Sequence, residues 1–211
     1  LPFAGPGDPL VIDSLLARAG TLSVPWLKGA FIFLLVGYGT KMGLAPLHSW
    51  KPDTYGEAPG VAGAILAGVI TSCPFLGILR AFQICAAAGL AGFAQNLLVI
   101  MGLLSMATAA AFIIGQRDFK RMLAYSSVEH MGILALGVGL GPAGAFAALL
   151  HMLNNGLTKG VLFLSAGNIH RAFGGKTMDH ARGALRRAPI SATLFLLGFV
   201  AITGSPPFGP F

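Results

Sequence analysis

Three polar side chains lie at helical spacing inside a long apolar stretch, Phe146–Ile169. His151, Asn155 and Lys159 are each four residues apart, so at about 100° per residue they share one helix face and climb about 12 Å along it. The imidazole and the amine can exchange protons, and the amide can orient water between them. The stretch is long enough to cross a bilayer, where such groups are costly unless they are paired or hydrated. The pattern therefore predicts a file of proton-carrying groups inside a membrane helix.

Two further charged sites interrupt apolar runs. Lys41 lies well inside one run, and we interpret it as functional; the alternatives are a lysine that snorkels to the interface and a polar link between helices. Glu129 and His130 lie in another run and are the candidate counter-charges. For that pair, the alternative is a buried ion pair that only fixes packing.

No metal or cofactor motif is present in the sequence. Cys73 and Cys85 are twelve residues apart in one apolar run, about 18 Å on a helix, which is too far for a disulfide. There is no CxxC and no Cys/His cluster at metal-ligand spacing. We therefore predict no cofactor and no metal on this chain. One alternative is a haem b redox subunit with His130 and His151 as axial ligands.

The composition indicates a membrane protein. Of 211 residues, 55% are apolar and 10% charged, and the mean hydropathy is +0.77, outside the range of soluble domains. The net charge of +7 comes from basic residues in the segments between apolar runs, so it indicates topology and not a nucleic-acid surface. Because the sequence starts without methionine and stops within an apolar run, we expect a fragment of a longer polytopic protein.

The apolar runs predict an all-α transmembrane bundle of about six spans, with no β alternation. Residues 1–25 are expected to form an interfacial loop with a short amphipathic helix at Leu10–Ala19. Two helices are expected to be broken, near 41–47 at Pro46 and near 204–210 at Pro206 and Pro207. The six predicted spans are 26–47, 60–86, 93–115, 122–140, 146–169 and a last one from 189.

The connecting segments predict the orientation of the spans. Basic residues follow the third and fifth spans, whereas the turns after the second and fourth carry no lysine or arginine. The positive-inside rule places the basic connections, and the polar segment 48–59, in the cytoplasm. Residues 116–121 are expected to be a solvated basic turn. The two broken helices then run in opposite directions, as in an inverted-repeat transporter.

Four ordered motifs resemble the antiporter-like membrane subunits. They read GTKMGLAPLHSWKPDTYGEAPG, QRDFKRMLAYSSVEHMG, HMLNNGLTKGVLFLSAGNI and GSPPFGPF. This family includes the large proton-pumping subunits of respiratory complex I, the Mrp Na⁺/H⁺ antiporters and subunits of membrane-bound nickel–iron hydrogenases. These motifs are most similar to hydrogenase-4 component F and its formate hydrogenlyase relatives, and the resemblance covers about residues 31–211.

The resemblance implies two inverted helical repeats, with residues 26–86 closing the first and 93–211 forming most of the second. It matches Lys41 to the lysine of the first broken helix, and His151 and Lys159 to the polar file of the second repeat. The charged residue expected on the last broken helix would fall beyond Phe211.

The sequence also departs from the family pattern. Ser72 stands where complex I subunits carry a bridging lysine, and Asn155 stands where histidine is common. The loop reads WKPDTY where WLPDAH is usual, so Lys51 and Tyr55 are expected to alter the cytoplasmic mouth.

These features predict a proton-translocating membrane subunit of a redox-driven complex. Protons would pass Lys41, the region of Ser72 and His130, then Lys159 and His151. The expected partners are other membrane subunits, a peripheral arm with a nickel–iron hydrogenase and iron–sulfur subunits, and the lipid bilayer, but no nucleic acid. The expected location is the cytoplasmic membrane of a prokaryote, as a multi-pass protein. The alternatives are a stand-alone Mrp-type antiporter and an inert scaffold that has kept the fold.

Overall fold

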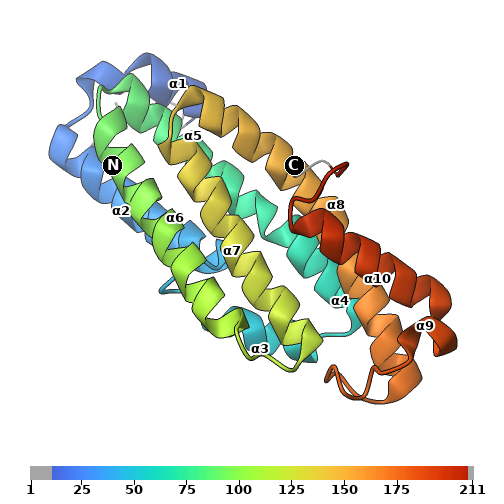
Figure 1. The fold of residues 1–211 in the computed structure, drawn as a ribbon. Coiled ribbons are helices and arrows are strands. Elements are labelled where there is room, and N and C mark those ends of the chain that lie inside the picture. The colour runs from blue at the N-terminus through green and yellow to red at the C-terminus, as the bar shows by residue number, and fades with distance from the viewer. Residues whose placement is uncertain (1–10, 209–211) are drawn as a thin grey trace.

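The computed structural model describes residues 11–208 as an elongated helical bundle (Figure 1). Within that range it has no β-strand, and one isolated bridge joins Asp118 to Thr177. The predicted all-α class is confirmed. The long helices are α2 (Val24–Met42), α5 (Ser72–Ala87), α6 (Ala91–Ile113), α7 (Phe119–Gly139), α8 (Pro142–Phe173) and α10 (Pro189–Ile202). The short ones are α1 (Ile12–Ala17), η1 (Ala19–Thr21), α3 (Trp50–Glu57), α4 (Gly60–Ile65), η2 (Leu66–Ile70) and α9 (Ala184–Arg187).

The outer faces of the bundle are apolar. Phe33 on α2 and Leu157 on α8 are 79% and 75% exposed, as suits side chains that meet lipid or partner helices. Among the described residues, the segments Gly60–Ala87 and Ala91–Ile113 are long and apolar enough to span a membrane. The apolar helix α10 has 14 residues.

Helix α2 ends earlier than the sequence predicts. It stops at Met42 because Gly43 adopts a left-handed conformation with φ +82°, and the Gly43 amide donates to the carbonyl of Gly39. The helix thus breaks within the predicted range 41–47. The expected end at about Leu47 with Pro46 as the breaking residue is wrong, because Gly43 ends the helix and Pro46 follows in the loop.

The second broken segment also follows a glycine. Helix α10 stops at Ile202, and Gly204 has φ +74°. Pro206 and Pro207 lie beyond this turn. The predicted break at 204–210 extends past the described residues, as does Leu10 of the predicted amphipathic run, whose remainder contains α1.

Glycine contacts bring α8 close to the segment α4–η2. A Cβ on Gly60 would lie 2.8 Å from the Cα of Gly167, and one on Gly68 would lie 3.0 Å from the carbonyl oxygen of Gly156. The five residues of η2 form a π-helical turn, which the sequence did not predict. The backbones can therefore pack together without intervening side chains.

Polar segments between the long helices meet at one end of the bundle. The segment 48–59, expected to be a loop, contains the short helix α3. The Phe119 amide donates to the Lys176 carbonyl, and the Met178 amide donates to the Arg117 carbonyl. The three connections that the charge pattern assigned to one compartment thus lie together.

Candidate functional site

Lys159 is enclosed between α8 and α7. Its side chain has 0% exposure. The amine donates to the carbonyl of Leu123 and to the hydroxyl of Ser126, both at 2.9 Å. These bonds offset part of the free-energy cost of placing an amine at membrane depth. The bond to Ser126 also places a hydroxyl group next to the protons of the amine.

His130 and His151 form a direct pair. Nδ1 of His130 lies 2.9 Å from Nε2 of His151, and the ring centroids are 5.0 Å apart. One nitrogen must donate and the other accept, so the pair holds a proton between the rings. Two axial haem nitrogens would need the iron between them, at metal–nitrogen distances of about 2 Å each. Nitrogens that are hydrogen-bonded to each other do not fit that arrangement.

A cavity of about 550 Å³ lies beside the histidine pair. Ser126, Glu129 and both histidines line it from α7 and α8. Ser126 therefore touches the cavity on one side and the Lys159 amine on the other. The rest of the lining comes from α7, α6, α10 and the turn after α10: Met122, Leu123, Ile133, Ile113, Phe199, Ile202, Thr203 and Gly204.

Asn155, the third member of the predicted file, is 1% exposed. Within residues 11–208, neither its amide nitrogen nor its amide oxygen has a hydrogen-bond partner. Buried amides in folded proteins are almost always bonded to protein or to internal water. Asn155 thus offers a donor and an acceptor one turn from Lys159.

The structure does not bring Lys41 and Ser72 to this cavity. Lys41 is exposed in the last turn of α2 and lines an apolar groove of about 520 Å³ with Tyr38 and Cys73. The Ser72 hydroxyl donates to the Gly68 carbonyl at 3.2 Å and lines a different groove. Their roles in proton transfer stay predictions.

The sequence did not predict the burial of two further lysines. Lys120, expected in a solvated turn, is 1% exposed, and its amine donates to the carbonyls of Gly56 and Ala58; that expectation is wrong. Lys51 is 0% exposed, and its amine donates to the Met42 carbonyl at 2.7 Å. Burial lowers the pKa of Lys51 to about 7. The lysine in WKPDTY was the only sequence signal for this second site.

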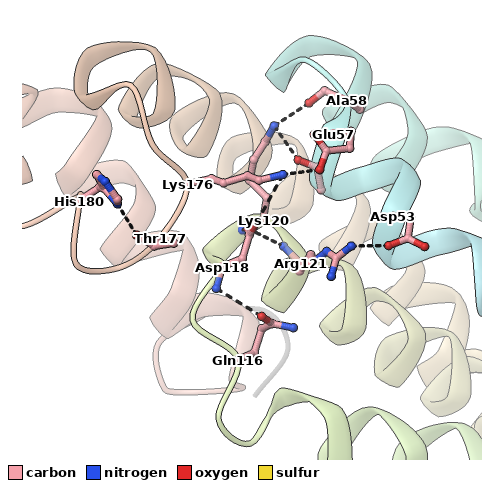
Figure 2. A network of polar contacts seen from close by, with 11 residues as sticks. Asp53, Glu57, Ala58, Gln116, Asp118, Lys120, Arg121, Lys176, Thr177 and His180 are labelled. Atoms are coloured by element: carbon pink, nitrogen blue, oxygen red, sulfur yellow. Dashed lines mark hydrogen bonds and ion pairs between the residues drawn. The ribbon is translucent and has the colours of Figure 1, made fainter.

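A charged network holds α3 at the rim of the bundle (Figure 2). Asp53 pairs with Arg121 of α7, and Glu57 pairs with Lys176 of the segment after α8. Asp118 caps α7 by accepting from the amides of its first turn. Lysine hydrogen-bonding holds the pKa of Glu57 below its usual range. The outer face of α3 is thereby tied to two other elements. Within residues 11–208 no three His, Cys, Asp or Glu side chains gather as a metal site.

Comparison with known families identifies the architecture. Residues 10–211 match the family described as NADH:quinone oxidoreductase/Mrp antiporter, transmembrane. The chain belongs to this family of antiporter-like membrane subunits. It is 39% identical over 199 residues to a hydrogenase-4 component F homolog of Methylacidiphilum infernorum, covering 94% of this chain and 42% of the relative. The predicted family resemblance is confirmed.

Two solved structures share the fold of this antiporter-like subunit. A chain of the archaeal membrane-bound sulfane sulfur reductase superposes with a TM-score of 0.88 at 25% identity, over 95% of this chain and 41% of that one. A chain of the Mrp complex from Dietzia sp. DQ12-45-1b gives 0.77 at 22% identity, over 94% and 40%. The chain thus spans about two fifths of the length of these relatives.

Proposed function

We propose that this antiporter-like subunit carries protons across a membrane through the α7–α8 cavity. The observation that carries the proposal is the fully buried Lys159, bonded to Ser126 at the edge of a cavity that also holds the His130–His151 pair. A proton can pass from the lysine amine to the serine hydroxyl and on to the histidine pair, because each group both gives and accepts hydrogen bonds when neutral.

Movement of charge near Lys159 supplies enough energy for such transport. Carrying one proton against 100 mV takes about 2.3 kcal/mol. Two unit charges 4 Å apart interact by about 4 kcal/mol at an effective dielectric constant of 20. A single charge that approaches or leaves Lys159 during electron transfer elsewhere in a complex is therefore sufficient to move its proton.

The family membership and the hydrogenase-4 relative support a redox-driven complex as the setting. We place the subunit in the cytoplasmic membrane of a prokaryote, beside other membrane subunits and a peripheral arm with a nickel–iron hydrogenase and iron–sulfur subunits. The chain itself would hold no cofactor, and the direct contact between His130 and His151 disfavours a haem iron bound between these two rings.

Lys159→Ala in the full-length subunit and its complex tests the proposal. Proton uptake into inverted membrane vesicles, driven by hydrogen or formate and followed by a pH-sensitive dye, should fall at least tenfold while the subunit still assembles. Lys28→Ala is the matched control, because Lys28 of α2 lies over the Phe93 ring of α6 and does not line the cavity. Undiminished uptake in Lys159→Ala would overturn the proposal.

A Mrp-type Na⁺/H⁺ antiporter is the second candidate, favoured by the family description and by the shared fold of the Dietzia complex. It predicts that adding Na⁺ to vesicles without hydrogen or formate changes the internal pH. The redox-driven proposal predicts no such change.

A further inference from the structure

The end of α2 leaves a slot that Lys51 fills. A Cβ on Gly43 would lie 2.6 Å from Cδ of Lys51 and 3.0 Å from its amine. Only a residue without a side chain fits there, so the lysine chain can pass behind the helix end. Its amine donates a hydrogen bond to the carbonyl of Met42, the last residue of α2.

The two faces of α3 explain why Lys51 is inside. Asp53 and Glu57 are exposed at the rim and tied by ion pairs, whereas Lys51 and Tyr55, four residues apart, are both 0% exposed. The Tyr55 ring lies 5.7 Å from the Lys51 amine and edge-on to Phe163 of α8. The ion pairs of Asp53 and Glu57, drawn in Figure 2, fix the outer face of α3, and Lys51 lies on the buried face of the same helix.

Lys51 is not engaged as a structural ion pair. Among the described residues, its amine has one hydrogen-bond acceptor and no carboxylate partner within 4.0 Å. Lys120, by contrast, binds two carbonyls that close the turn between α3 and α4. A buried amine with donors to spare is costly if its only task is to hold the fold.

Lys51 lies between the regions that contain the two predicted lysines. On one side its amine contacts Met42, the neighbour of Lys41 in the chain. On the other side the Tyr55 ring, which lies 5.7 Å from the Lys51 amine, packs edge-on against Phe163, one helical turn from Lys159 on α8. The Ser72 side chain lines a different groove, and its hydroxyl donates to the Gly68 carbonyl of the preceding turn η2. Lys51 therefore supplies a titratable group between the end of α2 and Lys159, where the predicted path had only Ser72.

Buried polar groups without hydrogen-bond partners lie near Lys51 and near Lys159. The Tyr55 hydroxyl faces Thr71 but makes no hydrogen bond of good geometry within residues 11–208. The same holds for the Asn155 amide, one turn from Lys159. Buried hydroxyl and amide groups of this kind are the usual partners of internal water.

We propose that Lys51 is a further proton-carrying residue that links the end of α2 to Lys159. The Lys51 ammonium gives up one proton and becomes a neutral amine, and the neutral Lys159 amine takes up one proton and becomes an ammonium. No bond other than N–H changes, and no oxidant or reductant is needed. This proposal rests on the proposed function of the α7–α8 cavity.

Lys51→Leu tests it, because leucine is usual at this position in the family wording WLPDAH and should fit the slot. In the full-length subunit and its complex, uptake driven by hydrogen or formate should fall at least fivefold with normal assembly. Lys51→Arg separates transfer from charge, because arginine keeps the charge and the bond to Met42 but does not release its proton. It should be as impaired as Lys51→Leu. Lys28→Leu is the control for loss of one lysine.

The outcomes separate the two proposals. If Lys159→Ala abolishes uptake and Lys51→Leu keeps at least half of it, the Lys51 proposal is overturned and the cavity proposal stands. If Lys159→Ala has no effect, the cavity proposal fails first. If Lys51→Arg restores wild-type uptake, Lys51 acts as a fixed charge and the proposal is overturned. If Lys51→Leu does not assemble, Lys51→Arg decides by the same criterion.

Discussion

The lysine-bearing helices α8 and α2 place their amines in opposite surroundings. Lys159 of α8 is fully buried with two acceptors on α7. Lys41 of α2 is exposed on an apolar groove. Both lysines interrupt apolar helices, so the local sequence pattern predicts the same surroundings for both. The difference shows that the environment of a membrane lysine is set by what packs against its helix.

Glycines account for part of that difference. On α8, Gly156 and Gly167 face the backbone of η2 and α4, where a Cβ would lie within 3 Å of its neighbour. On α2, Gly29 and Gly37 have open space on the Cβ side. Close backbone contact therefore holds α8 against α4 while α7 supplies the acceptors for Lys159. The Lys41 face of α2 has no such contact within residues 11–208.

The largest expected difference between α8 and α2 is in how they tolerate leucine in place of a glycine. Gly167→Leu places a Cβ 2.7 Å from the Cα of Gly60. Because backbone atoms cannot move aside, we expect a loss of about 1–3 kcal/mol or more and little assembled complex. Gly37→Leu should assemble like the wild type, as measured by the amount of subunit in the purified complex and its thermal unfolding. An equal loss at Gly37 would break the comparison, because it would mean that another segment covers the Lys41 face in the complex.

The histidine pair should behave as one unit, with a smaller effect. His130→Phe and His151→Phe are each expected to lower proton uptake several-fold, since each removes one end of the 2.9 Å contact. The double variant should lose little more than the worse single variant. His170→Phe, near the C-terminal end of α8, is the control and should keep wild-type uptake. Additive losses would show that the two rings act separately and would weaken the α7–α8 region as a single path.

The sequence predicted much of this arrangement and missed specific parts. Helical spacing placed Asn155 and Lys159 on one inward face because that periodicity is local. It could not predict the burial of Lys120, because the carbonyls that accept from its amine are more than sixty residues away in the chain. It could not predict the burial of Lys51, because the sequence did not indicate that α2 ends at Gly43, where the slot for Lys51 forms. Side-chain patterning also gave no sign of the π-turn in η2, which is a backbone feature.

Lys51 offers the smallest and most specific test, since it is a buried lysine that can be compared with exposed Lys41. Burial lowers its pKa from 10.5 to about 7. Between these values the unfolded chain binds a proton that the folded chain does not, so stability should rise with pH across that window. Below about pH 7 both states are protonated and the full cost of burial remains. The titratable groups around it are His48 beside α3, Tyr55 on α3, His130 on α7 and Lys159 on α8.

Thermal unfolding of the purified complex between pH 6.5 and 8.5 measures this gain. The midpoint should rise with pH in the wild type and in Lys41→Leu, by about 2–4 °C for each kcal/mol in a chain of this size. Lys51→Leu should remove most of the rise, because the titrating amine is gone and the remaining charges are unchanged. A Lys51→Leu profile parallel to that of the wild type would place the titration on another group and would contradict the effect of burial on Lys51.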